Sequence, residues 1–232
     1  MRILTVAALV AAGVLAGLNG VATASAESAC VDLGGTVGQD QMCRVHTANP
    51  TYTLDFSFPN DYPDQAPVTA YLTQARDGFV NVAEMPGSWN LPYQLDAKGV
   101  GYRAGSATGG TRSVVFTVWQ NVGGVHPQTY YQAFNWDSAK SAPITFDTLF
   151  KPGTKPLNVI YPEVNRYLQK EQGMIDSIPP TDGLNPAKYQ NFAITDDSID
   201  FYFSQGEMFA ESAGPVEAKV PRALVAPMLA VS

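Results

Sequence analysis

Apolar and polar residues alternate along several short segments of the chain, and this two-residue period predicts half-buried β-strands. The strongest signal is at 113–122 (SVVFTVWQNV), where β-branched and aromatic residues occupy both faces, which predicts a central strand. Nearer the C-terminus the pattern predicts a hairpin in which Ile199, Phe201 and Phe203 share one face. The segments predicted to be extended are 52–58, 93–103, 113–122, 129–136, 192–195, 199–203 and 216–221.

Apolar residues at three- and four-residue spacing predict two amphipathic helices. One begins after Asp64, a favourable N-cap residue, and the other follows Pro156 and ends near Gly173. Thr145 is predicted to cap a further, short helical turn. Groups of strands with a few packed helices predict an α+β fold and not a doubly wound sheet. The apolar faces are Val68, Tyr71, Leu72, Ala75, Phe79 and Val82 in the first helix, and Leu157, Ile160, Val164, Tyr167 and Leu168 in the second.

The first 26 residues have the pattern of a cleavable secretory signal. Arg2 provides the positive start, residues 3–18 form an apolar run, and small residues place the cleavage between Ala26 and Glu27. The run is shorter than the ~20 residues that span a bilayer, so we expect no transmembrane anchor. The sequence therefore predicts a protein that is secreted or associated with the cell wall.

Cys30 and Cys43 are the only cysteines, and both follow the predicted cleavage site. An exported protein meets an oxidising environment, so we predict a disulfide that ties a glycine-rich segment to the domain. A metal site is the alternative, but two thiols with only His46 nearby do not make a four-ligand zinc site. We expect neither a metal nor another cofactor.

The composition is that of a globular protein, with 45% hydrophobic and 15% charged residues. The net charge is −7, so the chain lacks the excess of basic residues that binding to phosphate groups requires. We therefore expect no nucleic-acid partner.

Two residues are candidates for acid–base and nucleophilic chemistry. His126 lies in a Gly-Gly-x-His-Pro loop, where an exposed imidazole suits a general base. The alternative is a ring that holds a tight turn by bonding the backbone. No Gly-x-Ser-x-Gly motif occurs, and the nearest variant contains Ser212, with no histidine after it. If the protein is a hydrolase with a fold other than the α/β-hydrolase fold, Ser212 as nucleophile and His126 as base are the minimal catalytic pair. The alternative is structural: Gly214 provides a backbone turn before the last strand, and the motif has no catalytic role.

The region 119–136 is rich in aromatic residues, which is typical of a carbohydrate- or protein-binding face. Core packing explains the same residues. Strand alternation places Tyr131 and Asn135 on one face, and Tyr130, Phe134 and Trp136 on the other. Tyr131 and Trp136 are therefore the candidate binding residues.

Asp196, Asp197 and Asp200 form a small acidic cluster. A weak calcium site is one interpretation, but the spacing is not that of an EF-hand and the composition is that of a turn.

Two groups of segments together resemble a known family. The first is 123–127 (GGVHP), 130–137 (YYQAFNWD) and 144–150 (ITFDTLF), and the second is 192–203 (FAITDDSIDFYF) followed by 213–217 (AGPVE). Both resemble the extracellular domain of RsiV-type anti-sigma factors, which senses lysozyme. With the signal and the cysteine pair, the whole chain resembles the secreted immunogenic proteins of mycobacteria.

The resemblance covers residues 30–222 and implies a β-grasp-like α+β fold. It also suggests the following organisation: a signal at 1–26, a disulfide-bonded segment at 27–50, an N-terminal half at 51–140, an RsiV-type half at 141–222 and a tail at 223–232.

The leading functional hypothesis from the sequence is a secreted, non-enzymatic protein that binds an envelope or host protein. The alternatives are a cell-wall-associated carboxylesterase, an activity attributed to some members of the family, and a module that binds lysozyme. The acidic chain would attract such a basic enzyme.

Overall fold

The computed structural model of the chain describes residues 29–124 and 126–231. The predicted signal sequence, with its cleavage point between Ala26 and Glu27, lies outside the described residues. Among the residues described, no helix is both long and apolar enough to cross a membrane.

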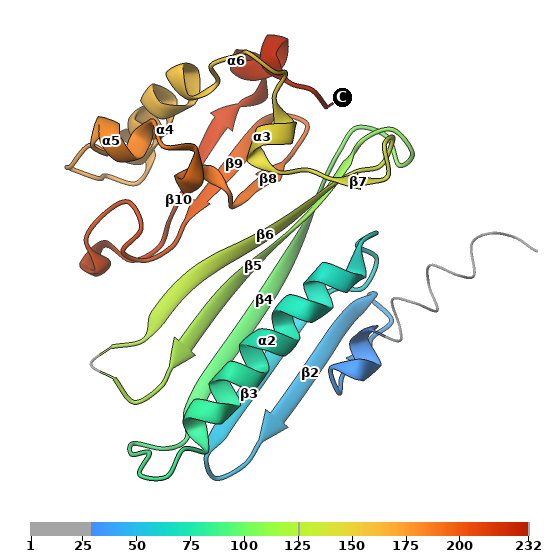
Figure 1. Ribbon diagram of the computed structural model, residues 1–232, viewed down its shortest axis with the longest axis vertical. Helices are drawn as coiled ribbons and strands as arrows, with labels where there is room; N and C mark the ends of the chain where they lie inside the picture. Colours follow the sequence, from blue (N-terminus) through green and yellow to red (C-terminus); the bar gives the residue numbers. More distant parts are fainter. Residues whose placement is uncertain (1–28, 125, 232) are drawn as a thin grey trace, which may run out of the picture.

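Seven strands, arranged in chain order, form a large mixed sheet (Figure 1). Neighbouring strands are antiparallel except β3 and β4, which are parallel. Parallel neighbours need a crossover connection, and helix α2 (Gln65–Ala83) supplies it. The strands are β1 (Thr36–Val37), β2 (Met42–Ala48), β3 (Tyr52–Pro59), β4 (Tyr93–Ala104), β5 (Thr111–Asn121), β6 (Gln128–Asp137) and β7 (Ala142–Pro143).

Helix α2 lies along one face of this sheet (Figure 1). Leu72 and Phe79 of the helix share a buried cluster with Phe116 of β5. Asp64 occupies the N-cap position as predicted, but its side chain makes no capping hydrogen bond. The position of the helix therefore depends on its apolar face more than on its cap.

A second, three-stranded sheet contains β8 (Phe192–Ile194), β9 (Ser198–Phe203) and β10 (Val216–Pro221), in the order β10–β9–β8. One of its faces is covered by helices, as Figure 1 shows, and Ile199, Phe201 and Phe203 are fully buried there, as predicted from their alternation. The helices are α3 (Phe146–Leu149), α4 (Leu157–Glu171), α5 (Pro180–Gly183) and α6 (Arg222–Val225), with single 3₁₀ turns at Pro186–Tyr189, Glu211–Ala213 and Ala226–Met228.

The other face of the small sheet packs on the large sheet. Tyr202 of β9 lies in a small buried cluster with Val115 of β5. Hydrogen bonds also join the layers: among them, the Asn135 side-chain amide donates to the Phe192 carbonyl at 2.9 Å, and the Ile194 N–H donates to Ser113 Oγ at 3.2 Å. The order of the layers is thus helix, large sheet, small sheet, helices.

The α+β class predicted from the sequence is confirmed. The finer β-grasp-like description and the predicted boundaries between segments stay predictions.

Cys30 and Cys43 form the predicted disulfide, with their Cα atoms 5.7 Å apart. Both residues are fully buried in the cluster beneath α2. The bond therefore attaches the start of the described chain to the core of the large sheet.

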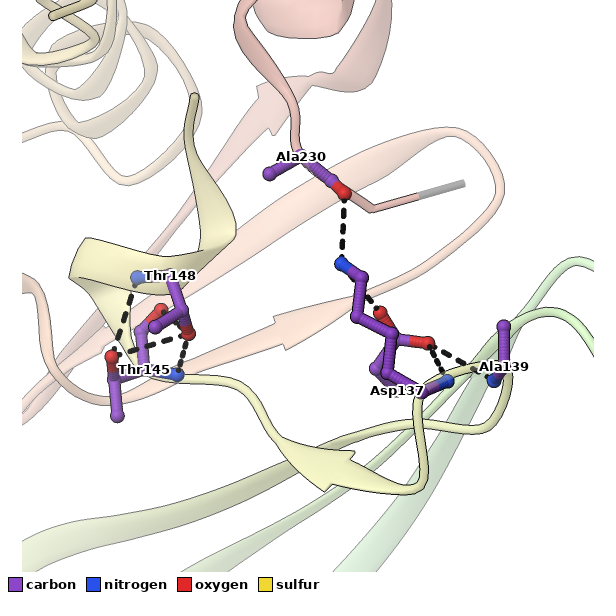
Figure 2. A network of polar contacts seen from close by, with 6 residues as sticks. Asp137, Ala139, Thr145, Thr148 and Ala230 are labelled. Carbon is purple, nitrogen blue, oxygen red and sulfur yellow. Dashed lines mark hydrogen bonds and ion pairs between the residues drawn. The ribbon is translucent and has the colours of Figure 1, made fainter. Parts of the chain in front are cut away.

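The turn predicted after Thr145 is helix α3. Thr148 Oγ1 accepts a hydrogen bond from the Thr145 N–H at 2.8 Å, and Thr145 Oγ1 accepts from the Thr148 N–H at 3.3 Å (Figure 2). This reciprocal pair is a capping box, and the turn buries Leu149.

Figure 2 also shows how the turn between β6 and β7 is joined to the C-terminal end of the chain. Asp137 accepts hydrogen bonds from the backbone N–H groups of Ala139 at 3.0 Å and Lys140 at 3.1 Å. The Lys140 ammonium pairs with Asp137 at 3.1 Å and donates to the Ala230 carbonyl at 3.1 Å. Burial alone would raise the pKa of Asp137, but these hydrogen bonds and the Lys140 charge outweigh it, so the pKa lies below its ordinary value.

Candidate functional site

The small sheet covers only part of the face of the large sheet on which it packs. It packs beside Tyr102 and Val115, whereas His46, Asp96 and Lys98, on the same face, are exposed. We call the uncovered region the open face; it consists of Arg44, His46, Thr53, Asp55, Ser57, Gln94, Asp96, Lys98, Thr117, Trp119 and Asn121.

Strand register arranges these side chains in rows, because every second residue of a strand points to one face. One row is His46, Asp55, Asp96, Trp119 and Thr129, and the next is Arg44, Ser57, Lys98, Thr117 and Tyr131.

His46 and Asp55 form the closest polar pair of the open face. The Nδ1 of His46 lies 2.6 Å from Oδ1 of Asp55, and both side chains are at least half exposed. Since a carboxylate only accepts, Nδ1 carries a proton, and in the neutral imidazole Nε2 then has the lone pair. This is the tautomer that a histidine needs to act as a general base.

Asp96 lies next to Asp55 in the same row. Burial raises the pKa of Asp96, and the negative charge of Asp55 raises it further. The charge of Asp55 therefore opposes the ionisation of Asp96.

Ser57 lies in the adjacent row, between Arg44 and Lys98. It is half-buried, and its hydroxyl has no hydrogen-bond partner among the described residues. Ser57 is a diagonal neighbour of His46 across β2 and β3, and such diagonal pairs are separated by about 7–8 Å. The hydroxyl and the imidazole thus open into one cleft.

Arg44 and Lys98, the two cationic residues beside Ser57, differ in whether an acidic side chain already pairs with them. Arg44 donates to Asp40 at 3.0 Å, and this guanidinium lowers the pKa of the Asp40 carboxyl to about 2. Lys98 has no ion-pair partner in the described part of the chain. The cleft has a volume of about 350 Å³ and is lined by Arg44, Val45, His46, Asp55, Phe56, Ser57, Asp96, Ala97 and Lys98.

The histidine singled out from the sequence lies elsewhere, in the loop between β5 and β6. The Nε2 of His126 is 3.2 Å from Oε2 of Glu211, and its Nδ1 is 3.2 Å from the Pro127 carbonyl. The structure therefore brings His126 next to the chain segment of Ser212, which directly follows Glu211. Ser212 is exposed and makes no hydrogen bond to the ring or to any other described residue. A catalytic role of His126 and Ser212 stays a prediction.

The two candidate binding residues, Tyr131 and Trp136, lie on opposite faces of β6, as alternation predicted. The Tyr131 ring centre is 5.2 Å from that of Tyr202, and Trp136 packs against the cluster beneath α2. Both side chains are only partly accessible, and a binding role for them stays a prediction.

Sequence analysis did not bring together His46, Asp55 and Ser57. A signal was present, since Asp55 and Ser57 occupy the polar positions of the first predicted strand. The missing information was the partner strand, because β2 was not predicted and its register places His46 opposite Asp55.

Known proteins include relatives whose sequences match this chain over nearly its whole length. Residues 147–223 match a family described as protein of unknown function (DUF3298). The chain is 50% identical over 228 residues to "Esterase Rv3036c" of Mycobacterium tuberculosis, covering 98% of this chain and 99% of that protein. It is 42% identical over 222 residues to "Immunogenic protein MPB64" of Mycobacterium bovis, covering 96% and 97% respectively.

Among solved structures, a DUF3298 family protein from Pseudomonas aeruginosa has a TM-score of 0.56 at 12% identity, covering 83% of this chain and 95% of that one. This similarity supports the fold alone. The identities over almost the full length confirm the family resemblance seen in the sequence: the chain belongs to the immunogenic protein MPT64/MPB64 family.

Proposed function

We propose that the protein is an exported carboxylesterase in which Ser57 is the nucleophile, His46 the general base and Asp55 the group that orients the imidazole. The observation that carries the proposal is the 2.6 Å contact from His46 Nδ1 to Asp55, which leaves Nε2 free in the cleft of Ser57. The 50% identity to a protein named an esterase supports the reaction class.

The proposed chemistry follows from these residue assignments and requires His46 Nε2 to reach the Ser57 hydroxyl in the substrate complex. In the first step Ser57 Oγ attacks the ester carbonyl carbon while His46 Nε2 takes the proton of the Ser57 hydroxyl. The resulting imidazolium then donates this proton to the departing alcohol, which leaves an acyl-serine ester. Water, deprotonated by the same imidazole, then attacks the acyl-serine ester. The imidazolium returns this proton to Ser57 Oγ as the bond to the acyl group breaks, and the carboxylic acid is released. Asp55 stays ionised and stabilises the imidazolium in both steps.

The negative oxygen of each tetrahedral intermediate needs a positive partner. Lys98 is paired with Ser57 in the register and has no ion-pair partner among the described residues. We assign it the role of stabilising this oxygen. Arg44, on the other side of Ser57, is engaged by Asp40 and contributes mainly to the local positive potential.

Hydrolysis of p-nitrophenyl acetate tests the proposal. Ser57→Ala and His46→Gln should each reduce kcat on the order of 10³-fold or more, and Asp55→Asn on the order of 10²-fold or more. Because these side chains lie on the surface or partly so, the variants should keep their stability to within about 0.5 kcal/mol, which thermal unfolding checks.

Ser212→Ala and His126→Gln are the matched comparison, since they remove the serine and histidine of the other candidate pair. They should retain activity under the proposed assignment. If they abolish hydrolysis and the Ser57 and His46 variants do not, the reaction belongs to the loop site and the assignment is wrong.

A second candidate function is the one that ranked first in sequence analysis, namely binding to another protein. The observation in its favour is an exposed apolar segment after α2, in which Trp89 is 64% and Met85 is 59% exposed. A basic wall-degrading enzyme such as lysozyme is the proposed partner, because the chain carries a net charge of −7. Trp89→Ala should weaken binding by at least about 1 kcal/mol in a titration at physiological salt, whereas no saturable signal would rule this partner out.

Both candidates place the protein outside the cytoplasm. The proposal of export is supported by the signal pattern of residues 1–26. Mass analysis of protein purified from the culture medium and from the cell wall should give a mature chain that begins at Glu27.

A further inference from the structure

Trp119 lies in the row of His46 and Asp55 and is flanked in the register by Asp96 and Thr129. Its side chain is half-buried, yet among the described residues it packs against none of the three apolar clusters and meets no other aromatic ring. Trp136, by contrast, packs against the cluster beneath α2. A flat indole without an apolar partner therefore lies within a polar sheet face.

The polar side chains around Trp119 have unused bonding capacity. Gln94 and Thr117 make no side-chain hydrogen bond to any described residue. Asn121 uses its amide oxygen to accept from the Gly123 N–H at 3.2 Å, which leaves its amide nitrogen available. Amide and hydroxyl groups that can both donate and accept thus lie on either side of the Trp119 row, which suits a ligand whose groups do the same, as sugar hydroxyls do.

Charge on the open face argues for a neutral ligand. The carboxylates Asp55 and Asp96 are balanced by the cations Arg44 and Lys98, so the face carries no excess charge for an anionic or cationic chain, and an apolar chain would cover these groups without satisfying them. The apolar C–H side of a sugar ring, however, stacks on an aromatic face while its hydroxyls reach the polar neighbours. A glycan chain satisfies both requirements at once.

The spacing also fits. Adjacent strands are about 4.8 Å apart and alternate residues of a strand about 6.6 Å apart, so Trp119 on β5 and Ser57 on β3, two strands and one row apart, are separated by roughly 12 Å. A sugar ring on Trp119 therefore places a ring about two positions further along the same chain over the cleft of Ser57 and His46.

We propose that the open face binds a neutral, O-acylated polysaccharide, with Trp119 as the stacking platform and the ester of a sugar about two positions along the chain over Ser57. The position of the ester depends on the proposed esterase function, but the binding of the glycan does not. The substrate class is thus an acyl ester of a glycan hydroxyl, and the products are the free hydroxyl and a carboxylic acid.

The first test measures binding without hydrolysis. Calorimetric titration with deacetylated xylo-oligosaccharides, as a neutral glycan probe, should show saturable binding to the wild-type protein and to Ser57→Ala. Trp119→Ala should weaken it about tenfold, and Trp119→Tyr should restore most of it because the phenol ring keeps a stacking surface. Ile175→Ala is the control, because it removes a side chain that is 94% exposed and lies outside the open face. Absent binding, or equal loss in the Trp119 and Ile175 variants, would overturn the inference.

The second test uses O-acetylated xylo-oligosaccharides as substrate. Trp119→Ala should raise KM about tenfold with a much smaller change in kcat, since a stacking contact is made equally in the bound and transition states. An unchanged KM would contradict the role of Trp119. The two proposals fail separately: if p-nitrophenyl acetate is not hydrolysed, the esterase assignment falls while the calorimetric result still decides glycan binding.

Discussion

Tyr102 and Tyr202 lie 100 positions apart in the chain, and their hydroxyls are 2.8 Å apart in the structure, where Tyr202 donates to Tyr102. Tyr102 belongs to β4 of the large sheet and Tyr202 to β9 of the small one. Burial raises the pKa of Tyr202, and the bond to Tyr102 raises it further, so Tyr202 donates this bond as a neutral phenol. This contact is part of the interface that holds the two sheets together and limits the open face at one end.

Tyr202→Phe should lower the free energy of unfolding by about 1 kcal/mol, because one buried hydrogen bond is lost while the ring is kept. Tyr202→Ala should cost about 3–5 kcal/mol, since the ring contact with Tyr131 is also lost. Urea unfolding measures both values. Equal effects of the two substitutions would show that the ring packing contributes little to the interface.

The disulfide between Cys30 and Cys43 closes a short loop with a sequence separation of 13. Replacing both cysteines by serine should destabilise the protein by about 3 kcal/mol, through the added entropy of the unfolded chain. The intact mass of unreduced protein should be lower than that of the reduced form by the mass of two hydrogen atoms. Free thiols on the purified protein would contradict the predicted bond.

Asp137 makes the stability depend on pH in the acid range. Its pKa in the folded protein lies below the unfolded value of about 3.9, so its contribution is fully present above that pH and is lost as the pH falls through the folded pKa. Asp137→Asn should therefore cost about 1.5–3 kcal/mol near neutral pH and much less in strong acid. Denaturant titrations of both proteins across the acid range test this, and a constant difference at every pH would contradict it.

Two glycines provide a matched pair. At Gly183 in α5 an added Cβ would lie 2.1 Å from the Tyr161 ring, so Gly183→Ala should destabilise by about 1–3 kcal/mol. At Gly78 in α2 nothing lies within 4 Å of an added Cβ, so Gly78→Ala should stabilise the helix by about 0.5–1 kcal/mol. Thermal unfolding distinguishes the two signs.

His126→Ala tests the structural role of the loop between β5 and β6. The histidine is exposed and pairs with Glu211 at the surface, so its removal should change the free energy of unfolding by less than about 1 kcal/mol. A larger loss would mean that the ring holds the turn through the Pro127 carbonyl.

Much of the secondary structure could be predicted from local pattern. The helix from Gln65 to Ala83, the capped turn after Thr145 and the hairpin of β8 and β9 all lie where residue spacing placed them. These elements were predictable for the same reason: each has one apolar face, and only one local conformation places the residues of that face on the same side, where they can be buried. The Cys30–Cys43 bond was equally accessible, because no other cysteine competes.

The candidate site was less accessible to the same reasoning. His126 was conspicuous because glycines and a proline surround it, whereas His46 lies in a strand without such marks. Trp119 was one of several aromatic residues that core packing explained as well as binding. Only the layer arrangement distinguishes Trp119, on an uncovered face, from Trp136, which packs against the cluster beneath α2.

By itself, then, the sequence determined which segments become strands and helices, which cysteines bond and which side chains share a face, since these depend on neighbours a few positions away. The tertiary structure decided which faces are covered. His46 meets Asp55 through the register of β2 and β3, and the cleft beside Ser57 is open because the small sheet packs at the other end of the same face. The physical reason is that strand pairing and sheet packing bring together residues far apart in the chain, and local periodicity carries no information about which partners they meet.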